Sequence, residues 1–193
     1  RWAYHAIMPN IQQVNKYGFD IDSSTSGMSA FPGLVSYRAK KAAYFEAVER
    51  WALLMFSYGL VGIKDCSVES DAFKSYCLLV EGVRVVILQH KFNTLNGTEC
   101  FAYGFAAADT VESASKRAFV ELDRNVRVLH EHFDSKKCNN NLVLSLIDRR
   151  LIFFSSHEGS SLFKERVDCG KLLKKYLAVP EAIVDCPVIG PWS

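Results

Sequence analysis

The stretch Ser36–Phe56, SYRAKKAAYFEAVERWALLMF, decides the expected fold. Its small and apolar residues recur at steps of three and four, which is the spacing of an α-helix with a buried face. At about 100° per residue, Glu46, Glu49 and Arg50 fall within roughly one third of the helix circumference. Charge on a largely buried helix costs free energy unless it is paired or binds a ligand. This cluster is therefore the first candidate functional feature.

The residues that follow predict a β-hairpin and a third strand. Strands are expected at Lys74–Val80, Val83–Phe92 and Glu99–Ala107, because these runs are rich in Val, Ile, Leu and Tyr. Glu81-Gly82 separates the first two runs and is typical of a hairpin turn. Gly104 marks a position in the third strand from which bulk is excluded.

A second long helix is expected at Thr110–Phe133, capped by the Thr110 side chain. One stripe of this helix is expected to be buried, and the neighbouring stripe carries charge. The buried stripe comprises Ala114, Ala118, Leu122 and Leu129, and the charged one includes Arg117, Glu121 and Arg124. The second helix thus resembles the first in placing carboxylate and arginine beside small residues.

The rest of the chain is assigned from shorter patterns. A third helix is expected at Ser160–Leu177, and strands at Leu142–Ile147, Leu151–Phe154 and Ala182–Ile189, while residues 20–33 are predicted to form a loop. These elements predict an α+β or mixed α/β fold, with an antiparallel or mixed sheet on which long helices pack. We expect a single domain over residues 1–193, truncated at one or both ends because the first residue is Arg.

Composition excludes several classes of function. The net charge of +2 is spread along the chain and gives no basis for nucleic-acid binding. The apolar runs are too short and too interrupted to span a membrane. The six cysteines show no C-x-x-C spacing and predict free thiols in a reducing cytoplasm, with three disulfides in an exported protein as the alternative. Cys66, Cys100 and Cys186 are interpreted as buried thiols rather than nucleophiles.

The paired charges on the two helices admit a structural and a functional interpretation. Glu46–Arg50 and Arg117–Glu121 have the i,i+4 spacing of ordinary helix-stabilising pairs. If the two helices pack together, however, three carboxylates would converge and repel one another unless a cation lay between them. Mg²⁺ uses few protein oxygens together with phosphate oxygens, and arginines bind phosphate through two parallel hydrogen bonds.

Two segments resemble the YcaO domain family. Residues 39–54, AKKAAYFEAVERWALL, are similar to the family's S-A-x-x-E-A-x-E-R helix, and residues 103–126, YGFAAADTVESASKRAFVELDRNV, are similar to its second conserved segment. The resemblance implies binding of ATP and Mg²⁺ between these helices. It further implies phosphorylation of a peptide backbone amide, as in cyclodehydratases that form azolines, or in thioamide formation, during post-translational modification of ribosomally made peptides.

The resemblance also assigns roles to individual residues. Glu46, Glu49 and Glu121 match carboxylates that hold metal, and Glu121 also contacts the nucleotide. Arg50 matches an arginine of the nucleotide site, and Arg124 is a further candidate phosphate ligand. No catalytic nucleophile or peptide substrate is implied by these residues.

Several positions depart from the family pattern. Ala42 stands where the family has Ser, Met28 where a Lys is common, Arg124 where a second Glu or Gln is usual, and Ala106 where a second Gly is expected. These losses predict fewer groups to neutralise phosphate and metal, so a degenerate domain that binds a peptide or partner protein without catalysis is the alternative. A homodimer is also left open. Trp51 is predicted to lie in the core, although it could stack on an adenine.

Overall fold

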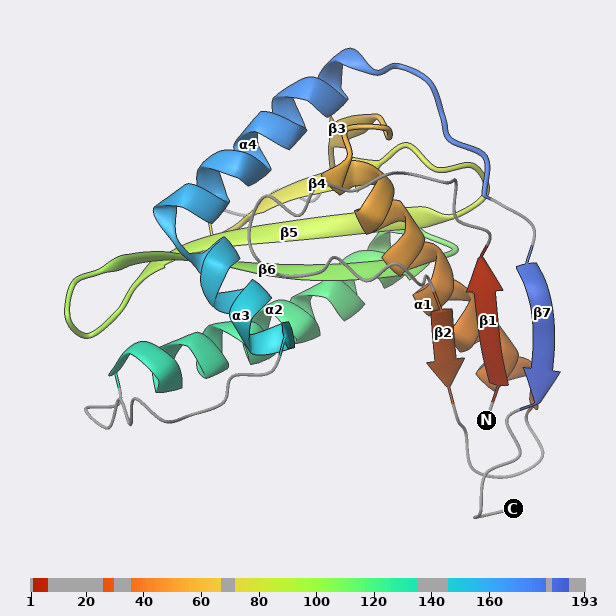
Figure 1. Ribbon diagram of the computed structural model, residues 1–193, viewed down its shortest axis with the longest axis horizontal. Coiled ribbons are helices and arrows are strands. Elements are labelled where there is room, and N and C mark those ends of the chain that lie inside the picture. Colours follow the sequence, from red (N-terminus) through yellow and green to blue (C-terminus); the bar gives the residue numbers. More distant parts are fainter. Residues whose placement is uncertain are drawn as a thin grey trace.

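Four antiparallel strands form the sheet on which the helices pack (Figure 1). The computed structural model describes residues 2–6, 26–29, 36–66, 72–134, 146–179 and 182–187. The sheet has the order β3-β4-β5-β6, with β3 at Ile63–Asp65, β4 at Lys74–Leu78, β5 at Arg84–Asn93 and β6 at Glu99–Ala108. The helices are α1 at Ser36–Ser57, α2 at Val111–Asp134, α3 at Leu146–Ser155 and α4 at His157–Leu172. The predicted α+β fold with an antiparallel sheet is confirmed.

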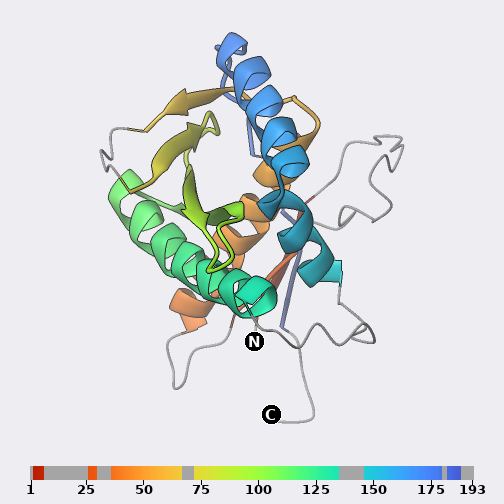
Figure 2. The ribbon, with the colours of Figure 1, turned by 90° about the vertical axis from the view of Figure 1, so that its left-hand side faces the viewer.

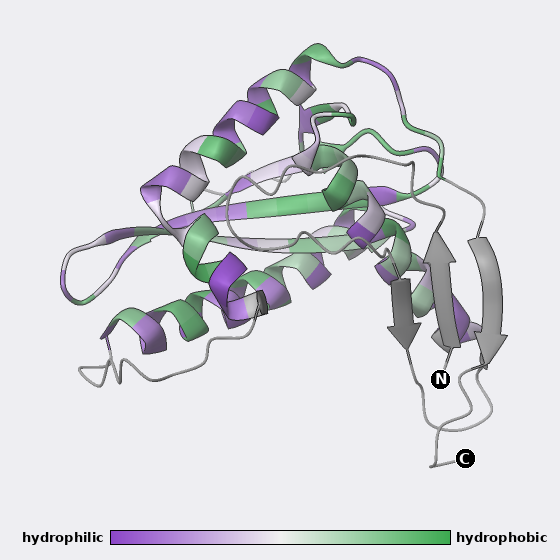
Figure 3. Cartoon of the chain, in the orientation of Figure 1, coloured by the Kyte–Doolittle hydropathy of each residue, from purple (hydrophilic) through white to green (hydrophobic). Residues whose placement is uncertain are grey.

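Both faces of this sheet are covered by helices, because successive side chains of a strand point to opposite faces. On β5, Val85 and Ile87 pack in one core with apolar residues of α1 and α4, whereas Val86 and Leu88 pack in a second core against α2. Figure 2 shows α2 and α4 on opposite sides of the strands. Figure 3 shows the hydropathy along β5, which is hydrophobic near its start, where these core residues lie, and polar towards its end.

Helix α1 is buried on most of its circumference because it packs against two sheets. It contacts β6 on one side and β1 and β2 on the other. Strands β1 (Trp2–Ala6), β2 (Ser26–Ser29) and β7 (Ala182–Pro187) form a separate antiparallel sheet in the order β2-β1-β7 (Figure 1). Trp51 is only 3% exposed, which confirms its predicted place in the core.

Helix α2 lies unusually close to β6 at Gly104. A Cβ atom at Gly104 would overlap the Ala118 carbonyl oxygen and lie 2.6 Å from the Leu122 nitrogen. Only glycine therefore allows the helix backbone to approach the strand to this distance. The predicted buried stripe of α2 faces the sheet, since Ala114, Ala118, Leu122 and Leu129 are all buried.

The hairpin and the start of α2 form as predicted. Strands β4 and β5 pair antiparallel, and Gly82 in their connection has a φ of 69°, a conformation that side chains other than glycine rarely adopt. The Ser113 N–H donates a hydrogen bond to the Thr110 side-chain oxygen over 3.2 Å, which satisfies one free donor at the helix start.

The predicted strand at Leu151–Phe154 is wrong. The end of the predicted strand at Leu142–Ile147 is also wrong, and its residues 142–145 lie outside the part of the chain that the structure describes. Residues 146–155 form α3 instead, and the Asp148-Arg149-Arg150 segment between the two predicted strands is part of this helix. The spacing of the apolar residues before and after this charged triplet also fits the period of a helix. Leu151 packs near the α2 core and Phe154 contacts Tyr103, so the apolar residues of α3 still face the protein.

Two further boundaries differ from the prediction. Helix α4 begins at His157, capped by the Ser156 side chain, and ends at Leu172 rather than residue 177. It ends early because the Leu177 backbone pairs with Leu79 and Glu81 in hydrogen bonds of 2.9 and 3.0 Å. Residues 26–29 of the predicted loop form β2, because β1 supplies backbone partners from a distant part of the sequence.

Replacing Gly104 by alanine should destabilise the fold strongly, because the added methyl group would meet backbone atoms of α2. We expect Gly104→Ala to lower the free energy of unfolding by about 3 kcal/mol or more in urea denaturation. Gly82→Ala is the control, since nothing lies within 4 Å of its added Cβ. Its positive φ should cost only about 1 kcal/mol. Equal losses for the two variants would contradict the close approach of α2 to β6.

Candidate functional site

Side chains from two helices cover the free edge of β6. This strand is the last of its sheet, so every second residue directs its backbone polar groups away from β5. The Asn125 side-chain amide donates to the Tyr103 carbonyl oxygen over 2.8 Å. The Phe105 N–H donates to Glu121 Oε2 over 2.8 Å.

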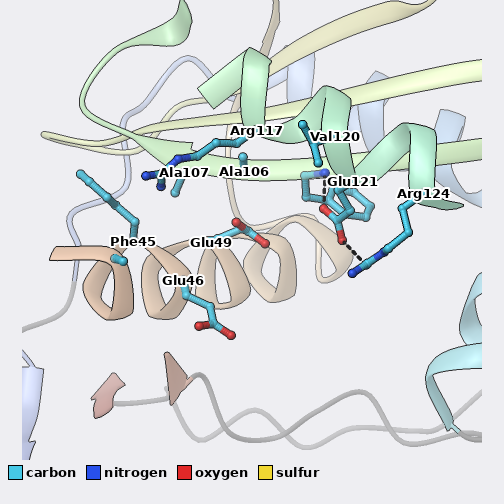
Figure 4. Close-up of a pocket in the computed structure, with 11 residues that line it drawn as sticks. Phe45, Glu46, Glu49, Ala106, Ala107, Arg117, Val120, Glu121 and Arg124 are labelled. Carbon is cyan, nitrogen blue, oxygen red and sulfur yellow. Dashed lines mark hydrogen bonds and ion pairs between the residues drawn. The ribbon is translucent and has the colours of Figure 1, made fainter. Parts of the chain in front are cut away.

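One strand step further, the Ala107 N–H lies close enough to the Glu49 carboxylate to favour its charged form. Glu49 belongs to α1 and Glu121 to α2, so β6 binds one carboxylate from each helix. The predicted convergence of these two side chains is thus present in the structure. Figure 4 shows them pointing towards one another between the two helices.

The two carboxylates lie in a cavity of about 320 Å³ between α1, α2 and β6. Its lining consists of Ala42, Phe45, Glu46, Glu49, Phe105, Ala106, Ala107, Arg117, Val120, Glu121 and Arg124. Three carboxylates and two guanidinium groups therefore share one concave surface with small and aromatic residues. Among the residues singled out from the sequence, the structure brings Glu46, Glu49, Glu121 and Arg124 together here.

The position of Glu49 disfavours its charged form. Removal from water is the largest cause, and the neighbouring Glu121 carboxylate is the next, and together they raise the pKa of Glu49 to about 8. The hydrogen bond from the Ala107 N–H opposes this rise. Burial also raises the pKa of Glu121, against the Phe105 N–H and the Arg124 guanidinium, which favour its charged form. Burial in the cavity therefore disfavours the charged form of both carboxylates, and their proximity disfavours it further at Glu49.

Two arginines flank the carboxylate pair (Figure 4). An Arg124 guanidinium nitrogen lies 3.6 Å from Glu121 Oε1, a loose contact for an exposed side chain. Arg117 lines the cavity and makes no ion pair with any described residue, so it is not the helix partner of Glu121 that its spacing predicts. Arg117 lies on the charged stripe predicted for this helix, and the structure places that part of the stripe at the cavity.

The Glu46–Arg50 pair has a different orientation from the one the resemblance implies. Arg50 Nη2 lies 2.7 Å from Glu46 Oε1, the ordinary i,i+4 geometry, and Arg50 is not part of the cavity lining. Figure 4 shows Glu46 directed away from Glu49 and Glu121. Glu46 thus lines the cavity but is paired with Arg50 and turned away from the carboxylate pair, and the predicted nucleotide ligand Arg50 lies outside the lining.

The residues present fit a single divalent cation better than a larger metal cluster. Within the described ranges, no group of three or more His, Cys, Asp or Glu side chains could hold a metal ion. Glu121 nevertheless keeps one carboxylate oxygen beyond the one bound to β6, and the Glu49 carboxylate lies beside it in the cavity. Mg²⁺ is commonly held by one or two carboxylates, with the other positions filled by water or phosphate. The repulsion between these two carboxylates, which contributes to the raised pKa of Glu49, is the observation that supports this fit.

Three of the four positions that depart from the family pattern, Ala42, Ala106 and Arg124, line the cavity. At Ala42 and Ala106, a hydroxyl and a second glycine were expected. Met28 belongs to β2 and pairs with Ala3. The missed lining residues Phe45, Phe105 and Val120 could not be assigned from the sequence, because nothing in it shows which apolar side chains border a cavity.

Fold and site together define an α+β domain with an acidic, arginine-flanked cavity where two helices meet the edge of a sheet. In the part of the chain that the structure describes, no helix combines the length and apolar character required to cross a membrane. No family model, no curated protein and no solved structure matches this chain.

The raised pKa of Glu49 makes stability depend on pH. A carboxyl group whose pKa rises on folding stabilises the protein below its unfolded pKa, 4.5, and that contribution is lost as pH rises to about 8. We expect wild type to lose about 3 kcal/mol from this source between pH 5 and pH 8, measured by urea denaturation. Glu49→Gln should give a shallower slope, because Gln keeps an acceptor for Ala107 without a charge.

Glu112→Gln is the matched control on the exposed face of α2. The hydrogen bond from Lys116 lowers the pKa of Glu112 below 4.5, so this group is ionised throughout the range and adds no slope there. Identical pH slopes for wild type and Glu49→Gln would contradict the described environment of Glu49.

Proposed function

We propose that the cavity between α1 and α2 binds Mg²⁺ together with the polyphosphate of ATP. The observation that carries this proposal is the pair Glu49 and Glu121, which come from different helices and meet beside backbone N–H groups of β6. Carboxylates held in place by backbone donors lose little freedom on binding a cation. Arg117 and Arg124 flank the same cavity with positive charge.

A cation would reduce the electrostatic repulsion between the Glu49 and Glu121 carboxylates. Glu46 is paired with Arg50, so the two carboxylates that face one another in the cavity are Glu49 and Glu121, flanked by Arg117 and Arg124. In the absence of a cation, Glu49 holds a proton at neutral pH, because burial and the Glu121 carboxylate raise its pKa to about 8. Binding of Mg²⁺ should therefore displace this proton.

The arginines favour a ligand that also carries negative charge. Guanidinium groups bind phosphate oxygens with two parallel hydrogen bonds, and Arg117 has no competing ion pair among the described residues. A cavity of about 320 Å³ is at the lower end of small-molecule sites. This volume suits a metal-bound triphosphate, with the nucleoside extending past the lining.

The resemblance to the YcaO family extends the proposal to a reaction. In that family ATP supplies the phosphoryl group that activates a peptide amide, and Mg²⁺ offsets the charge of the phosphates. The two segments that carry the resemblance contain Glu49 and Glu121, the carboxylates that meet at β6. We therefore propose an ATP-dependent activation of a peptide backbone amide, leading to azoline or thioamide formation.

A non-catalytic domain that binds a peptide or protein partner is the second candidate. It is favoured by the fact that Glu49 and Glu121 already have a structural use as partners for the β6 backbone. Ala42 also brings no hydroxyl group to the cavity. In this case a proton on Glu49, rather than a metal, would balance the carboxylate pair.

Calorimetric titration with Mg·ATP separates the two candidates. We expect wild type to bind Mg·ATP, and the double variant Glu49→Gln with Glu121→Gln to bind at least about 10-fold more weakly, because both metal ligands lose their charge. Arg117→Ala and Arg124→Ala should also weaken binding. Proton release, measured from the dependence of the binding heat on the buffer, should be lost in Glu49→Gln.

Arg127→Ala is the matched control for the arginine variants, since Arg127 lies on α2 and pairs with Asp123 on the helix surface. It should bind Mg·ATP as wild type does. No binding heat with wild type, or equal affinity in the double carboxylate variant, would remove the nucleotide site. The partner-binding candidate would then be tested by retention of a peptide or protein on the immobilised chain.

A further inference from the structure

Two thiols lie in contact away from the cavity. Cys66 Sγ lies 2.9 Å from Cys77 Sγ, a distance longer than the ~2.05 Å of a disulfide bond but short for two sulfur atoms that are not bonded. Both cysteines are free thiols in the structure. The sequence gives no hint of this pair, because the two residues are separated by ten others.

Strand pairing holds the two thiols together. The Cys66 N–H donates to the Ser75 carbonyl oxygen over 2.9 Å, so Cys66 extends the β3–β4 ladder beyond Asp65. Cys77 lies two residues after Ser75 and on the same face of the sheet. Cys77 belongs to the core between the sheet and α2, and Cys66 packs at the border of that core.

We propose that Cys66 and Cys77 form a reversible intramolecular disulfide by exchange with a small-molecule disulfide such as oxidised glutathione. The bond requires the two sulfur atoms to move closer by less than about 1 Å, and Cys66 lies just beyond the end of β3. This inference is independent of the proposed nucleotide site, since neither cysteine lines the cavity.

The two thiols have different roles in the exchange. Cys66 is half-buried, whereas Cys77 is 5% exposed, and burial together with the neighbouring Cys66 raises the pKa of Cys77 to about 12. The Cys66 thiolate therefore attacks oxidised glutathione first, breaking its S–S bond and releasing one glutathione. Cys77 then loses its proton and attacks Cys66 Sγ, releasing the second glutathione. Two thiol protons of the protein thus pass to two glutathione thiols, and the protein is oxidised as glutathione disulfide is reduced.

Peptide mapping of the native chain tests this proposal. Trypsin separates the two cysteines into peptides 65–74 and 75–84. After incubation of the folded, reduced chain with oxidised glutathione and alkylation of free thiols, we expect these two peptides as one linked species. Reduction should separate them again. The oxidised chain should also melt at a Tm higher by roughly 5 °C, because the bond restricts the unfolded chain.

Single variants test the order of the steps. In Cys77→Val, Cys66 should keep glutathione as a stable mixed disulfide. In Cys66→Ser, Cys77 should remain a free thiol. Cys100→Ser, a matched change at another buried cysteine, should still give the linked peptides. Absence of the 65–74 to 75–84 species in folded wild type at saturating oxidised glutathione, with Cys66 recovered as thiol or mixed disulfide, would overturn the proposal.

Discussion

The free edge of β6 is the constraint on which the rest of the site depends. An edge strand exposes backbone donors and acceptors, and burial beneath helices makes their satisfaction obligatory. Asn125 and Glu121 of α2 and Glu49 of α1 meet this requirement at Tyr103, Phe105 and Ala107. Gly104 lies among these strand positions and allows α2 to approach closely enough for its side chains to reach the strand.

The same contacts that complete the sheet edge create the electrostatic character of the cavity. The Glu49 and Glu121 carboxylates lie beside N–H groups of one strand. Both are removed from water there, and they are close to each other. Such a pair holds a proton or a cation more readily than two separated carboxylates would. The two proposed functions thus differ in what balances this charge, which is Mg²⁺ in the first and a proton on Glu49 in the second.

The sequence predicted the parts of the structure that follow from local pattern. The helices α1 and α2, the turn at Gly82 and the exclusion of bulk at Gly104 all follow from local sequence, and all are confirmed. The pattern of α3 was ambiguous because a short apolar segment suits a strand as well as a helix. The β2-β1-β7 sheet and the contact of Cys66 with Cys77 depend on pairing between segments whose register no local pattern fixes.

The candidate site was predictable in its residue types but not in its orientation. The sequence placed Glu46, Glu49 and Arg50 on one side of α1, yet the structure directs Glu49 to β6 and leaves Glu46 paired with Arg50. The roll of a helix about its axis is set by packing on both sides, and α1 packs against two sheets. The partners of Glu49 and Glu121 are backbone N–H groups, which every residue except proline carries, so no motif reveals them.

The ionisation of Glu49 tests this account most directly. The carboxyl carbon of Glu49, assigned by comparison with Glu49→Gln, would be followed by NMR as pH is varied with and without Mg²⁺. The account predicts a pKa near 8 without the metal and a clear fall when Mg²⁺ is added. A Glu49 that titrates near 4.5 in both conditions would contradict the claim that β6 brings two carboxylates together in a charged and poorly hydrated cavity.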